Sequence, residues 1–164
     1  MKAITPAFVG LALTLNTIAA AIAAPEDYTQ ELIAKQANLL MMQSKYNMLA
    51  AKPLMEQPSS TDAFFASCMQ LEGGSLSVFS SSITNISNLA LVLAVVKAPD
   101  ERKVVEGLLQ GSLAAARLAD KSVKNAVSIV AKVPQCRDND LTALENNLMS
   151  EVDSIEQTLS KVSP

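Results

Sequence analysis

Apolar side chains recur at alternating steps of three and four residues through most of this 164-residue chain. The cleanest run consists of Leu141, Leu144, Leu148, Val152, Ile155, Leu159 and Val162. A repeat of this period places its members on one face of an α-helix. Glycine is scarce, with five residues, and β-branched residues rarely alternate with polar ones as they do in half-buried strands. The sequence therefore predicts an all-α fold.

Five segments are predicted to be helical: 27–51, 60–74, 75–98, 99–133 and 141–162. We expect the short second helix to start near Ser60 or Thr61, either of which can cap it. It should end at Gly73 and Gly74, because glycine is the usual residue of a left-handed C-cap.

Prolines and acidic residues mark two further helix starts. Pro99 suits the first turn of the fourth helix, and Asp138 or Asp140 is expected to cap the fifth. The short connections around Pro99 and Pro134 make consecutive helices antiparallel. The predicted fold is thus an antiparallel bundle of four long helices plus one short helix.

Two cysteines test this topology. Cys68 lies just before the third helix and Cys136 just after the fourth, so both belong at the same end of the bundle. An even pair of cysteines in an exported domain usually forms a disulfide. We expect a Cys68–Cys136 bridge worth roughly 4 kcal/mol in the chain-entropy model. The alternative is two buried free thiols.

The first two dozen residues have the layout of a secretory signal peptide. Met1 and Lys2 form a short basic head, 7–24 carries no charge, and Ala21-Ile22-Ala23 fits a small-x-small cleavage pattern. We expect cleavage after Ala23 or Ala24, which divides the chain into a signal peptide, 1–23, and one helical domain, 24–164. The predicted location is periplasmic or extracellular.

Charge argues against nucleic acid and anionic membranes as partners. Without Lys2, 12 basic residues (13 − 1) face 16 acidic ones, a net charge of −4, and no basic cluster exceeds Arg102-Lys103.

The third helix has no charge between Glu72 and Lys97, but it is continuously apolar only over 89–96. Eight residues span about 12 Å, too little for a bilayer core. No stable transmembrane segment is therefore expected after cleavage.

Enzymatic chemistry has little support. The chain contains no histidine, which removes the commonest general base and most zinc sites. The serines of 75–82 have no Gly-x-Ser-x-Gly turn and no basic partner nearby. We predict a non-enzymatic protein with no catalytic residue, metal or cofactor.

Methionines suggest a binding surface. Met41, Met42, Met48 and Met55 fall within fifteen residues of the chain. Thioether side chains form adaptable surfaces, fill gaps in cores, and in exported copper proteins bind Cu(I). Met41, Met48 and Met55 are our candidates for partner binding, with core packing and copper as the alternatives.

Small residues recur every four positions in the fourth helix, at Gly107, Gly111, Ala115 and Ala119. Such a bare flank lets a neighbouring helix approach closely, and the expected neighbour is the third helix. The alternative is a slot for an apolar ligand between the two helices.

Together these features predict an exported helical-bundle protein that binds a protein partner, as an adaptor, inhibitor or immunity-type protein does. One alternative is a carrier that holds a lipid or other apolar molecule between helices. A second is an envelope structural protein.

Overall fold

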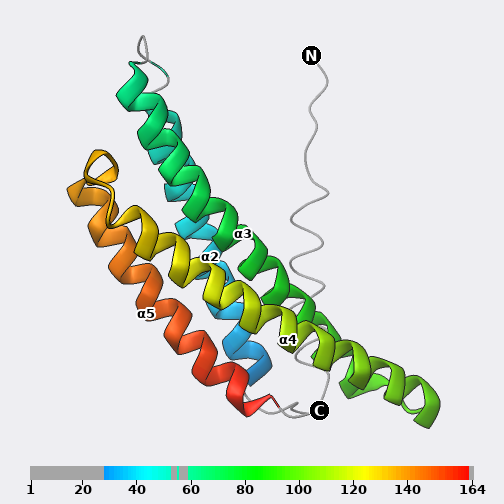
Figure 1. Cartoon of the computed structure of the whole chain (residues 1–164). Helices are drawn as coiled ribbons and strands as arrows, with labels where there is room; N and C mark the ends of the chain where they lie inside the picture. The colour runs from blue at the N-terminus through cyan, green and yellow to red at the C-terminus, as the bar shows by residue number, and fades with distance from the viewer. Residues whose placement is uncertain (1–27, 53–54, 56–58, 163–164) are drawn as a thin grey trace, which may run out of the picture.

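The computed structural model describes residues 28–52, 55 and 59–162, and this part of the chain is an all-α bundle (Figure 1). Its elements are α2 (Tyr28–Ala51), α3 (Ser60–Val95), α4 (Pro99–Val130), the 3₁₀ turn η2 (Pro134–Cys136) and α5 (Asn139–Lys161). The prediction of a bundle of four long helices is confirmed. The predicted signal peptide lies outside the described residues.

The helix α3 is the centre of the arrangement. It packs along α2 on one side and α4 on the other, while α5 lies against α2 and touches α4 less. The α3/α4 hairpin runs on past the end of α5 (Figure 1). Each long helix contributes one buried stripe to a single core. Its largest fully buried side chains are Tyr46, Phe79, Leu32, Leu39, Met69, Leu76, Ile83, Ile86, Leu109, Leu141, Leu148 and Ile155.

The separate short helix predicted over 60–74 is wrong, because α3 continues through Gly73 and Gly74. A Cβ added to Gly73 would lie 3.3 Å from the Cβ of Tyr46. Glycine at this position therefore serves the close approach of α2 rather than a helix end. Packing offsets the helix propensity that a mid-helix glycine loses.

Local caps set the helix starts. Ser59 caps α3: its hydroxyl accepts a hydrogen bond from the Asp62 amide at 3.2 Å, and the Asp62 carboxylate accepts one from the Ser59 amide at 2.9 Å. The predicted cap was one or two residues too late. Asp138 caps α5 and Pro99 begins α4, both as predicted. The α4 helix ends at Val130, three residues before the predicted end.

The predicted disulfide is present. Cys68 in the third turn of α3 joins Cys136 in η2, with their Cα atoms 6.2 Å apart. Both cysteines are buried. The bridge fastens one end of the bundle, as the antiparallel topology requires.

By length and composition, α3 is apolar enough to cross a membrane. The central helix of a packed bundle meets the same criterion. Thirteen residues of α3 are buried in this bundle, from Ala66 to Leu93.

Candidate functional site

The three candidate methionines lie at the surface. Met41, Met48 and Met55 are 59%, 61% and 83% exposed, whereas Met69 belongs to the core. Met42 is half-buried and packs against the core from α2. The sequence could not separate surface methionines from core methionines, and the structure does.

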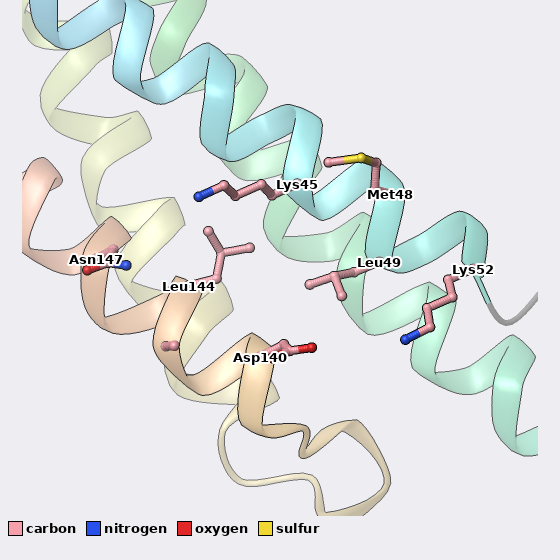
Figure 2. Close-up of a pocket in the computed structure, with 8 residues that line it drawn as sticks. Lys45, Met48, Leu49, Lys52, Asp140, Leu144 and Asn147 are labelled. Atoms are coloured by element: carbon pink, nitrogen blue, oxygen red, sulfur yellow. The ribbon is translucent and has the colours of Figure 1, made fainter.

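Met48 borders a hollow between α2 and α5 of about 310 Å³ (Figure 2). Leu49 of α2 and Leu144 of α5 line its apolar part, together with Ala143. Polar side chains surround these apolar groups: Lys45, Lys52, Asp140 and Asn147. A ligand in this hollow would contact apolar side chains together with two lysine amines and the carboxylate of Asp140.

A second hollow, of about 450 Å³, adjoins the first and shares Leu49, Lys52 and Asp140 with it. It leads past Phe65 toward Arg137 beside the disulfide. The two hollows form one depression, which we call the α2/α5 groove. In the described part of the chain, Lys45 and Lys52 take part in no ion pair. Their charges are therefore available to a partner.

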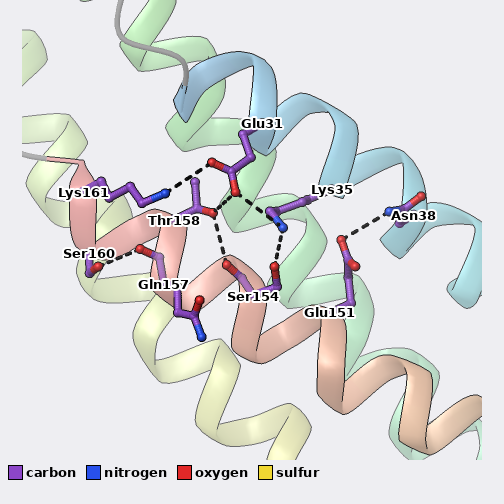
Figure 3. Close-up of polar contacts among 9 residues, drawn as sticks. All are labelled: Glu31, Lys35, Asn38, Glu151, Ser154, Gln157, Thr158, Ser160 and Lys161. Carbon is purple, nitrogen blue, oxygen red and sulfur yellow. Dashed lines mark hydrogen bonds and ion pairs between the residues drawn. The ribbon is translucent and has the colours of Figure 1, made fainter.

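Polar contacts close the opposite end of the α2/α5 seam (Figure 3). The Glu31 carboxylate accepts a hydrogen bond from the Thr158 hydroxyl at 2.7 Å, and Lys161 lies 3.7 Å from the same carboxylate. The Thr158 hydrogen bond, followed by the charges of Lys161 and Lys35, lowers the pKa of Glu31. The Asn38 amide also donates to Glu151 at 3.3 Å. Polar contacts thus join the start of α2 to the end of α5, whereas the groove separates the end of α2 from the start of α5.

A buried acidic pair joins α3 and α5, and it was not foreseen from the sequence. Glu72 of α3 and Glu145 of α5 meet Tyr46 of α2 in the interior. Glu72 and Tyr46 are fully buried, and Glu145 is 9% exposed. Both carboxylate oxygens of Glu72, one of Glu145 and the Tyr46 hydroxyl have no hydrogen-bond partner in the structure. Buried polar groups without partners are costly, so their protonation matters.

Burial raises the pKa of Glu72 to about 8, and the adjacent Glu145 carboxyl acts in the same direction. Burial is the main cause that raises the pKa of the Tyr46 hydroxyl, and the negative charge of an ionised Glu72 is the second. No lysine or arginine of the described residues forms an ion pair with either acid. Glu72 is therefore protonated at neutral pH, and its carboxyl is uncharged in the interior.

One sequence signal could have revealed this pair. Glu72 is the only charged residue between Asp62 and Lys97, and it lies one helical turn from both Cys68 and Leu76. A lone charge within an apolar stripe indicates a buried ionisable group. Its partners on α2 and α5 are too distant in sequence to be recognised before the fold is known.

The small-residue flank of α4 does not pack as predicted. Gly107, Gly111 and Ala115 are exposed, and only Ala119 is buried. A Cβ added to either glycine would meet nothing within 4 Å. The flank therefore faces outward along most of its length, and these four residues do not line one slot against α3.

No three histidine, cysteine or acidic side chains of the described residues lie where they could hold a metal ion. No known family model matches the sequence, and no curated protein or solved structure is similar to it. The groove and the buried pair are therefore interpreted from their own chemistry.

Proposed function

We propose that this chain is an exported, non-enzymatic binding protein that holds a segment of a protein partner in the α2/α5 groove. An adaptor, an inhibitor and an immunity-type protein all work in this way. The observation that carries the proposal is the position of Met48, which is 61% exposed and borders an apolar hollow. Exposed, adaptable thioethers beside a preformed pocket are typical of surfaces that bind protein segments.

The chemistry of the groove indicates what the partner offers. Leu49 and Leu144 suit one large apolar side chain, and the hollow of about 310 Å³ is large enough for it. Lys45 and Lys52 lie on the α2 side of the same hollow (Figure 2). We expect a helical segment with an apolar anchor residue flanked by carboxylates. The apolar anchor would supply most of the affinity, and the charges would orient the segment.

The disulfide supports export, because such bonds persist in oxidising compartments. The signal-peptide layout of the first residues points the same way. Both features support a periplasmic or extracellular location.

A photo-crosslinking amino acid in place of Met48 tests the proposal in cells that secrete the protein. The matched control carries it in place of Glu101, which is exposed at the start of α4 and lines neither hollow of the groove. We expect one protein to crosslink at position 48 and not at position 101. The same product should disappear in the K45E/K52E variant, whose melting temperature should stay within about 2 °C because both lysines are exposed.

Three results would reject the proposal. Equal crosslinking at both positions would show non-specific contact. A product that persists after both charge reversals would place the binding surface elsewhere. Crosslinks to a small apolar molecule alone would favour a carrier instead.

A further inference from the structure

The outward face of α3 carries no charge. Between Asp62 and Lys97 the only charged residue is Glu72, and it is fully buried. A helix of 36 residues is about 54 Å long. Surface helices of this length normally alternate apolar and charged faces, so an uncharged outer face needs an explanation.

The side chains on this face follow a heptad pattern. One row recurs every seven positions, at Phe64, Leu71, Val78, Asn85 and Val92. A second row follows three positions later, at Ser67, Gly74, Ser81, Asn88 and Val95. Its first three members are smaller than the residues they follow, and its last two are of the same type. All ten are exposed in the structure. We call these ten residues the outer seam, because two rows with this spacing form the contact line of a coiled coil.

The face extends onto α4. An uncharged row of exposed residues runs along α4 at steps of three and four positions, and two of its members, Gly111 and Ala115, belong to the small-residue flank. The row consists of Val104, Leu108, Gly111, Ala115, Leu118, Ser122, Asn125 and Ile129. Ser122 lies in this row, and its hydroxyl is 3.5 Å from that of Ser75 on α3. The small residues of α4 therefore leave room for a helix that arrives from outside the bundle.

We propose that the outer seam pairs with the same seam of a second copy of this chain, with the two α3 helices antiparallel. The alignment that overlaps all ten positions places Phe64 on Val95, Leu71 on Asn88, Val78 on Ser81, Asn85 on Gly74 and Val92 on Ser67. Each larger side chain then meets a smaller one. Parallel helices in register would instead place Phe64 on Phe64 and Gly74 on Gly74. Such crowding at one level and emptiness at another is contrary to the even packing of protein interfaces.

This self-complementarity favours a second copy over other occupants. A chain with a net charge of −3 repels its own copies except where its surface is uncharged, and the seam is such a surface. A lipid surface attracts helices with broad apolar faces and flanking lysine or arginine. Half of the seam consists of Ser, Gly and Asn instead. The dimer would leave the α2/α5 groove open, so it is independent of the proposed partner site.

Sedimentation velocity from about 1 to about 100 µM tests the proposal, since self-association in this range follows mass action. We expect the wild type to form a dimer and V78K to stay monomeric. Val78 is 60% exposed, so V78K should keep the helical content and melting temperature of a folded monomer. M48K is the control, because Met48 lies outside the seam, and it should dimerise like the wild type.

A charge pair tests the orientation. S67K and V92E should each weaken the dimer at least tenfold, and the double variant S67K/V92E should recover it. Antiparallel seams bring these two positions together, whereas parallel seams would place like charges opposite each other. A double variant weaker than both single variants would overturn the antiparallel arrangement.

The dimer itself would be overturned by a wild type that stays monomeric at about 100 µM, or by a V78K dimer of unchanged affinity. Binding of the monomeric wild type to phosphatidylcholine vesicles, lost in V78K, would assign the seam to a lipid surface instead. None of these outcomes depends on crosslinking at Met48, so the two proposals can fail separately.

Discussion

Replacing Glu72 with Gln should stabilise the bundle at pH 8 and change its stability little at pH 4.5. Gln has nearly the same shape as a protonated Glu and can donate a hydrogen bond to Glu145, but it cannot ionise. In the wild type, the pKa of Glu72 is about 8 in the folded state and 4.5 in a free side chain. The folded state therefore holds a proton that the unfolded chain releases between these two values.

The sign and size of the effect follow from linkage. The stabilisation from this proton is fully present below pH 4.5, falls as the pH rises, and is lost once the pH passes about 8. Each pH unit costs up to about 1.4 kcal/mol of unfolding free energy. The full interval corresponds to roughly 5 kcal/mol, and we expect a measured loss of about 2 to 5 kcal/mol because ionisation lets water enter beside Glu145.

Urea unfolding followed by circular dichroism, at half-unit steps from pH 4.5 to 9 and one protein concentration, measures this loss. The informative quantity is the difference between E72Q and wild type, since it cancels the other titrating groups. Burial also raises the pKa of Asp120, whereas hydrogen bonds lower the pKa of Asp62. Substitution E101Q, at the exposed start of α4, is the control and should leave the wild-type pH curve unchanged in shape. If E72Q and wild type run parallel between pH 5 and 8, Glu72 does not hold the proton.

Two further changes test the packing and the bridge. G73A should be less stable than G107A by at least about 1 kcal/mol in thermal or urea unfolding: each gains helix propensity, but only the first forces a Cβ against Tyr46. Equal stabilities would mean that α2 can move away at no cost. Reducing the Cys68–Cys136 bridge should lower the unfolding free energy by roughly 4 kcal/mol while far-UV circular dichroism keeps its helical form. An unchanged urea midpoint after reduction would show that the bridge adds nothing.

Much of the fold was predictable because helices depend on local repeats. The α5 stripe, the Asp138 cap, Pro99 at the start of α4 and the disulfide all follow from spacing along the chain. The break at Gly73 was wrong for a physical reason. A glycine that ends a helix and a glycine that admits a neighbouring helix look the same in a sequence, and only the position of Tyr46 separates them.

The candidate site was less predictable because it depends on contacts between distant segments. Exposure of Met48 required knowing which face of α2 meets the core. The repeat of Gly107 and Gly111 revealed a bare flank but not its direction, and the structure turns that flank outward. The meeting of Glu72 with Glu145 joins α3 to α5, which are separated in sequence by the whole of α4.

The disulfide separates the helices into two groups, those inside the covalent ring that it closes and those outside it. Residues 68–136 form a covalent ring that includes α4 and most of α3, and the outer seam lies almost wholly inside it. The helices α2 and α5 both lie outside the ring, and non-covalent packing alone connects them to each other. Parting α2 from α5 therefore stretches no covalent crosslink. A groove that opened by separation of α2 from α5 would leave the ring of residues 68–136 covalently intact, and with it most of the face on which we propose that a second copy docks.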